Sequence, residues 1–130
     1  MIETKRLIFR RWTKEDAAAL YALASDPEVG PHAGWPVHTS IEESRAVIKE
    51  YFSNDYTWAL VSKQTGAIIG CMGYYPYGES NIDIGKEDAE VGYWIGRPYW
   101  NQGYCTEALY AMAHVGLAHH PAHEQQCPCR

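Results

Sequence analysis

The sequence predicts one α/β domain with a mixed, mainly antiparallel sheet flanked by helices, in the order β-α-α-β-β-β-α. Its 130 residues, 46% hydrophobic and 21% charged, have the size and composition of a single soluble globular domain. Short runs in which apolar side chains alternate with others indicate strands. Three longer runs of helix-forming residues indicate helices.

The first part of the chain predicts a strand followed by two helices in tandem. Basic and apolar residues alternate over 6–11, as in a half-buried strand with Leu7 and Phe9 on one face. The segments 17–24 and 41–54 carry helix formers and apolar stripes. Each follows a Ser or Thr with an acidic residue three positions later, which is typical of a helix N-terminus.

The second part predicts an antiparallel hairpin, a third strand and a long helix. Turn-forming residues at 63–66 separate two alternating segments, which favours a hairpin. A long Gly-, Asn- and Asp-rich loop at 76–86 comes before the last strand. The predicted elements are strands at 56–62, 67–75 and 89–95 and a helix at 105–118.

Residues 119–130 are expected to form an irregular tail after a domain that spans residues 1–118. The tail has two prolines, three histidines and two cysteines, without an apolar period. Histidine and cysteine are metal ligands, but their spacing matches no familiar zinc module. The sequence therefore predicts no metal site.

Charge and cysteine usage exclude several functional classes. A net charge of -5 and a pI near 5.6 argue against binding to nucleic acid, which normally requires a basic face, and fit a cationic substrate better. The apolar runs are too short for a signal peptide or a membrane span. The four cysteines form no spaced secretory framework, which predicts reduced thiols and a cytoplasmic protein.

Residues 94–109 carry the most informative pattern: the end of a strand, a turn around Gly103 and the opening of a helix. The N–H groups of a first helical turn lack intrahelical partners and carry the positive end of the helix dipole, so they can bind a pyrophosphate. Glycine lets the anion approach the backbone closely. A lone glycine in such a turn is more often structural, so Gly103 taken alone favours a turn that merely starts a helix.

A shared pattern runs through four segments, 3–10, 13–17, 89–95 and 103–108. Together they resemble the GNAT N-acetyltransferase superfamily. The resemblance is to the branch that acetylates ribosomal-protein N-termini, polyamines and related small amines, and it covers about residues 2–118. It implies an acetyl-CoA-dependent enzyme that transfers an acetyl group directly to a primary amine of a small molecule or a protein N-terminus.

The resemblance also implies a cofactor site. Backbone groups of Trp94 and Ile95 are expected to face the pantetheine arm of acetyl-CoA, and six consecutive residues to hold the pyrophosphate. Cys105 stands where the family usually has Gly or Ala, and the alternative interpretation is a nucleophilic thiol activated by the helix N-terminus. The six residues are Asn101, Gln102, Gly103, Tyr104, Cys105 and Thr106.

Direct transfer to an amine requires a group that accepts the proton of the amine. Glu90, on the strand beside the expected thioester, is the candidate base. The alternative is an ordinary exposed or salt-bridged strand carboxylate. His32 and His38 lie in the loop where the family shapes its acceptor pocket, and the alternative for both is a solvated loop histidine.

The family pattern continues with a fifth strand, another helix and a closing hairpin, which we do not recognise after residue 118. We therefore expect a truncated domain in which strand 89–95 is an open edge. The alternative is a homodimer in which a second copy covers that edge. The corresponding alternative function is a non-catalytic, acyl-CoA-binding or dimerising remnant.

Overall fold

Six strands form one sheet in which the spatial order follows the order along the chain. The computed structural model describes residues 2–30, 36–54, 56–76, 89–115 and 122–124. Five strands pair antiparallel, and the sixth pairs parallel to the fifth. The strands are β1 (Ile2–Glu3), β2 (Leu7–Arg10), β3 (Thr57–Ser62), β4 (Ile68–Pro76), β5 (Ala89–Ile95) and β6 (Ala122–Glu124).

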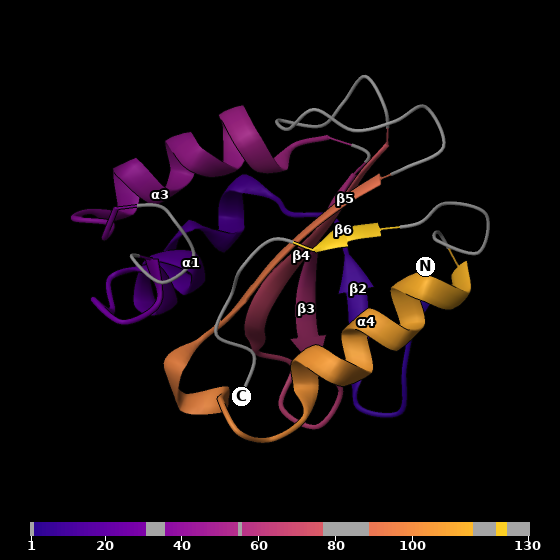
Figure 1. The fold of residues 1–130 in the computed structure, drawn as a ribbon. Helices are drawn as coiled ribbons and strands as arrows, with labels where there is room; N and C mark the ends of the chain where they lie inside the picture. Colours follow the sequence, from indigo (N-terminus) through magenta and orange to yellow (C-terminus); the bar gives the residue numbers. More distant parts are fainter. Residues whose placement is uncertain (1, 31–35, 55, 77–88, 116–121, 125–130) are drawn as a thin grey trace.

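Helices cover both faces of this sheet. Figure 1 shows α1 and α3 together on one side and α4 on the other, and α1 packs against α3. A π-helical turn extends α3 to Phe52, close to the predicted end of the second helix. The helices are α1 (Ala17–Ala24), α3 (Ile41–Val47) and α4 (Tyr104–Val115), with shorter turns at Lys14–Asp16, Ile48–Phe52 and Arg97–Tyr99.

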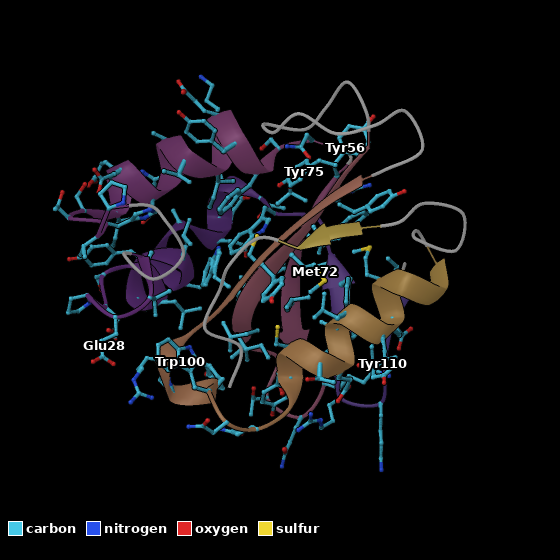
Figure 2. All side chains as sticks on the ribbon, viewed as in Figure 1. Glu28, Tyr56, Met72, Tyr75, Trp100 and Tyr110 are labelled. Carbon is cyan, nitrogen blue, oxygen red and sulfur yellow. The ribbon has the colours of Figure 1, made fainter. Side chains whose placement is uncertain are left out.

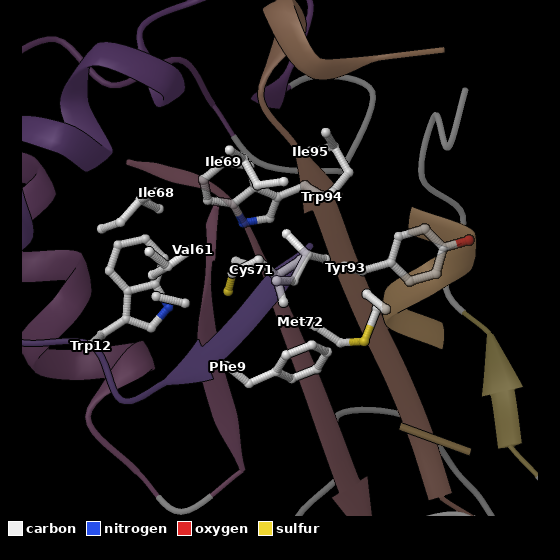
Figure 3. Close-up of a cluster of buried hydrophobic side chains, with 14 of the residues drawn as sticks. Phe9, Trp12, Val61, Ile68, Ile69, Cys71, Met72, Tyr93, Trp94 and Ile95 are labelled. Atoms are coloured by element: carbon white, nitrogen blue, oxygen red, sulfur yellow. The ribbon is translucent and has the colours of Figure 1, made fainter. Parts of the chain in front are cut away.

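The core lies between the sheet and these helices. Leu7 and Phe9 are buried, as the alternation in the sequence predicts. Figure 3 shows Tyr93 pointing toward the side of α4, while Trp12 lies on the side of α1 and α3. The Trp12 and Trp94 rings stack with centroids 6.5 Å apart. Neighbouring residues of β5 therefore contribute to two separate apolar layers.

The predicted fold class is confirmed, and the structure adds two strands to the predicted order. β1 precedes the first predicted strand. β6 lies inside the segment expected to be irregular, and it pairs with Ala89–Val91. The expectation of an open edge along 89–95 is therefore wrong for Ala89–Val91, and no described strand pairs with the rest of that edge. Most of the predicted loop at 76–86 lies outside the described residues, and so do residues 116–121 around the predicted end of the last helix.

Within the described ranges, none of the helices has the length and apolarity needed to span a lipid bilayer.

Candidate functional site

The backbone of β5 is directed by its pairing with β4. The Gly96 N–H donates to the Ile69 carbonyl at 2.8 Å, and hydrogen-bonded positions alternate along an antiparallel ladder. Two residues back along the ladder, the N–H and C=O of Trp94 therefore point to β4. Those of Tyr93 and Ile95 point to the opposite edge of the strand.

Among the described strands, β6 alone pairs along that opposite edge, and it covers one end. β6 pairs with Ala89–Val91, and in the part of the chain that the structure describes no strand pairs with Gly92–Ile95 on this side. The Ile95 carbonyl accepts the indole N–H of Trp100 at 2.7 Å. The Tyr93 backbone and the Ile95 N–H are thus the groups directed at the uncovered half.

The predicted role of Trp94 and Ile95 toward a pantetheine arm stays a prediction. The hydrogen-bonding pattern between β4 and β5 directs the backbone groups of these two residues to opposite edges of β5. The N–H of Ile95 is directed at the uncovered edge, whereas the N–H and C=O of Trp94 are directed at β4. Tyr93 has the same orientation as Ile95. The sequence analysis did not propose Tyr93, because the phase of a ladder depends on the pairing register, which no single strand reveals.

The Gly103 turn connects β5 to α4. Gly103 has φ +81° and Asn101 has φ +64°, and both values lie in the left-handed region that glycine and asparagine tolerate best. The Gly103 carbonyl accepts the Glu107 N–H at 3.0 Å. The N–H groups of Gly103, Tyr104 and Thr106 precede this first intrahelical bond, so the local geometry is that of an anion-binding helix N-terminus.

Residues of the N-terminal segment form hydrogen bonds with both sides of the Gly103 turn. Arg6 donates from its backbone N–H to Glu107 Oε2 at 2.9 Å and from Nε to Oε1 at 2.6 Å, and the Thr4 hydroxyl donates to Oε2. Arg6 Nη1 also donates to the Gln102 carbonyl at 3.0 Å. The Arg6 guanidinium lies over the Tyr104 ring, 4.2 Å from its centroid. We call this cluster the Glu107 clamp; it consists of Thr4, Arg6, Gln102, Tyr104 and Glu107.

The Glu107 clamp fixes the charge of its carboxylate. Burial alone raises the pKa of Glu107, but the hydrogen bonds from Thr4 and Arg6 and the Arg6 charge outweigh it and hold this pKa below its ordinary value. A carboxylate in the first turn of a helix repels a bound anion. Because Arg6 pairs with it, the negative charge is neutralised beside the turn.

The two cysteines with described side chains have different states. Cys71 is buried and forms no disulfide, whereas Cys105 is buried and disulfide-bonded. The expectation of reduced thiols is therefore wrong at Cys105. The alternative of a nucleophilic Cys105 does not fit this state, because only a thiolate is a nucleophile.

Glu90 lies in β5, in register with Tyr75 of β4 and His123 of β6. Its side chain is outside what the structure describes, so its role as base stays a prediction. The neighbouring Tyr75 hydroxyl lies 2.9 Å from the Thr57 hydroxyl. Figure 2 shows Tyr75 and Trp100 at opposite ends of the β4–β5 pair. Position 90 and Ile95 are five steps apart along the strand, about 17 Å.

His38 is buried, which differs from the expected solvated loop histidine. Its Nδ1 lies 2.8 Å from the Ser44 hydroxyl, and its backbone N–H donates to the Ala24 carbonyl at 3.1 Å. Burial lowers the pKa of His38, against an opposing effect of Glu43. These contacts make His38 a link between α1 and α3. His32 lies outside the described residues.

The described ranges contain no group of three metal-ligating side chains. Of the tail 119–130, for which no metal site is predicted, only 122–124 are described, so the prediction for the rest of the tail is untested.

Comparison with known proteins identifies the architecture. A family model described as an acetyltransferase (GNAT) domain matches residues 6–130. The uncharacterized N-acetyltransferase p20 of Bacillus licheniformis is 30% identical over 121 residues, which cover 88% of this chain and 64% of that protein. The chain thus spans less than two thirds of the length of this relative.

Solved structures give the same result. The structure of a putative ribosomal-protein-serine acetyltransferase from Vibrio cholerae matches with a TM-score of 0.67 and 27% identity, covering 85% of this chain and 63% of that one. RimL, a ribosomal L7/L12 α-N-protein acetyltransferase solved in complex with coenzyme A, matches with a TM-score of 0.63 and 20% identity over the same shares. The second likeness is one of fold alone.

Proposed function

The chain belongs to the GNAT acetyltransferase domain family, and from this premise we propose that it is an acetyl-CoA-dependent N-acetyltransferase acting on a primary amine. The observation that carries the proposal is the continuity of β5 with the Gly103 turn. β5 ends in a backbone edge with which no described strand pairs, and α4 begins with N–H groups suited to a pyrophosphate. A ligand with an extended amide-containing arm and a pyrophosphate matches both.

In this proposal the reaction is a direct transfer. The amine nitrogen forms a bond to the acetyl carbon, the carbon–sulfur bond of the thioester breaks, and the thiolate of coenzyme A leaves. Glu90 accepts the proton that the amine loses, directly or through water. A carboxylate suits this role because the attacking amine must be neutral.

The acceptor is proposed as a small-molecule amine or a protein N-terminus. The net charge of -5 favours a cationic acceptor through long-range attraction. The matched Vibrio cholerae protein and RimL are both named as ribosomal-protein acetyltransferases, which supports a protein N-terminus as the first acceptor to examine.

Calorimetric titration of acetyl-CoA tests the cofactor half of the proposal. The informative variant is Gly103→Ala, because a side chain at φ +81° strains the turn by roughly 1–2 kcal/mol. Gly66→Ala is the matched control: Gly66 has φ +74°, and a Cβ there has no neighbour within 4 Å. We expect both variants to lose stability and Gly103→Ala alone to lose affinity.

Release of free thiol in the presence of amines tests the transfer half. Binding of acetyl-CoA with amine-dependent thiol release supports the proposal. Binding without release for any amine would identify a non-catalytic acyl-CoA-binding domain instead. Absence of heat with the wild-type chain, shown folded by circular dichroism, would overturn the proposal. Sedimentation in the same buffer tests for the homodimer in which a second copy covers the edge of β5.

A further inference from the structure

We propose that Arg6 is a positioning residue for the cofactor, acting through the Glu107 clamp to fix the turn that receives the pyrophosphate. The inference rests on the proposed function and assigns a role to a residue far from the reacting groups. Arg6 and Glu107 are separated by 101 positions in the sequence. Their contact joins the first strands of the sheet to the helix that follows the last antiparallel strand.

The clamp is anchored on a rigid base. Leu7 is fully buried and pairs with Ser62, and the Arg6 carbonyl accepts the Lys63 N–H at 2.9 Å. The Thr4 hydroxyl, besides donating to Glu107, accepts the Leu7 N–H at 3.0 Å. The donors that hold Glu107 are therefore fixed by the sheet before any ligand arrives.

Arg6 reaches both sides of the turn at once. Its Nε holds the Glu107 side chain in the first turn of α4, and its Nη1 holds the Gln102 carbonyl just before Gly103. Only a guanidinium offers donors in this planar fork. The Gln102 carbonyl and the Gly103 N–H belong to one planar peptide unit, so this bond also orients the Gly103 N–H.

Charge adds a second effect. The Glu107 carboxylate lies one turn into α4, where an unpaired negative charge opposes an incoming anion. Arg6 neutralises it through a hydrogen-bonded ion pair, while the Tyr104 ring covers one face of the guanidinium. Loss of Arg6 is therefore expected to weaken anion binding twice, by loosening the turn and by exposing Glu107.

The chain contains a matched control at the other end of β2: Arg6 directly precedes this strand and Arg10 is its last residue. Arg10 donates from Nη1 and Nη2 to the two carboxylate oxygens of Asp16 at 2.8 and 3.0 Å, and Asp16 lies just ahead of α1. Arg6 and Arg10 are similarly exposed, at 39% and 35%. The two ion pairs differ chiefly in the helix at which they lie: the Arg10 pair lies at the start of α1 and the Arg6 pair at the start of α4. Of the two, the Arg6 pair is the one that contacts the Gly103 turn.

The experiment compares acetyl-CoA affinity by calorimetry with thermal unfolding for the wild type, Arg6→Ala and Arg10→Ala. We expect Arg6→Ala to raise the dissociation constant of acetyl-CoA at least tenfold and to raise KM with little change in kcat. Arg10→Ala should lower the unfolding temperature to a similar extent and leave the dissociation constant within twofold of the wild type. The Arg6→Ala loss should disappear for acetyl-pantetheine, which has no pyrophosphate.

Arg6→Lys is a second, milder variant that keeps the proposal testable if Arg6→Ala does not fold. Lysine keeps the charge, but one ammonium group cannot hold Glu107 and Gln102 together, so we expect a dissociation constant raised several-fold. Wild-type affinity in Arg6→Lys, or an equal loss in Arg10→Ala, overturns the clamp as a positioning device while the proposed function stands. Failure of the folded wild type to bind acetyl-CoA overturns the proposed function itself.

Discussion

The Trp100 indole N–H donates to the Ile95 carbonyl at 2.7 Å, so the chain leaving β5 is tied back to the last residue of that strand. Both residues are buried, and Trp100 also lies under the Arg97 guanidinium at 4.6 Å. This bond occupies one of the Ile95 backbone groups that face away from β4. It also sets where the polypeptide turns toward Gly103.

The Trp100→Phe variant is expected to destabilise the protein because it leaves the buried Ile95 carbonyl without its donor. Trp12→Phe is the matched control: the Trp12 indole N–H is buried and has no hydrogen-bond partner among the described residues. Both variants remove similar volume. We expect Trp100→Phe to cost about 1–3 kcal/mol more than Trp12→Phe in urea unfolding. Equal losses would mean that the bond to Ile95 contributes nothing to stability.

His38 is expected to make stability depend on pH. Because burial holds its folded pKa below the ordinary value of 6.5, the unfolded chain binds more protons between these two values. The free energy of unfolding should therefore fall as the pH is lowered from 6.5 through the folded pKa, by at most about 1.4 kcal/mol per pH unit. Urea unfolding of the wild type and His38→Asn measures it, and parallel pH profiles for the two would contradict the prediction.

Asp16 should contribute stability that is lost at acidic pH. Burial raises the pKa of Asp16, but hydrogen bonds from Arg10 and Thr13 and the Arg10 charge outweigh it and hold the pKa below 3.8. This contribution is complete above about pH 3.8 and is lost as the pH falls through the folded value. We expect Asp16→Asn to cost roughly 1 kcal/mol at pH 7 and nothing near pH 2, measured by thermal unfolding.

Glu28→Gln is the control for this measurement. Its pair with Arg97 spans 2.7 Å, but both side chains are about half exposed, so the change in unfolding free energy should stay within 0.5 kcal/mol. A loss at pH 7 as large as that of Asp16→Asn would show that burial does not distinguish the two pairs.

Glu90→Gln tests the proposed base. We expect kcat to fall by roughly 10²–10⁴-fold while the dissociation constant of acetyl-CoA is unchanged, because glutamine keeps the size of the side chain and loses its basicity. The pH–rate profile should lose its acidic limb. Steady-state kinetics with a saturating amine provides the measurement, and an unchanged kcat would leave Glu90 as a structural carboxylate.

Local patterns predicted most elements because each depends on residues close in sequence. The second strand of the sheet follows from the alternation of Leu7 and Phe9, and α1 matches the predicted 17–24. At Ser40 the cap is observed directly: the Ser40 hydroxyl accepts the Glu43 N–H at 3.0 Å. Propensity, periodicity and capping agree at these positions, which is the condition for reliable prediction.

Features that depend on residues far apart in the chain could not be predicted from the sequence. β6 has three residues of low β-propensity and is defined by its partner β5. The burial of His38 depends on Ser44, and the role of Arg6 depends on Glu107. In each case the residue looks ordinary in its local context, and only the pairing reveals its function.

The Glu107 clamp closes a loop of about a hundred residues, whereas most strand pairs join neighbours along the chain. A contact of such sequence separation is costly to form early in folding. The strands β1, β2 and β3 can pair before α4 is synthesised, but the contact between Arg6 and Glu107 cannot form until α4 has emerged. The Gly103 turn is therefore expected to gain this support late in folding. Affinity for an anion at this turn consequently reports whether a given molecule has completed its fold.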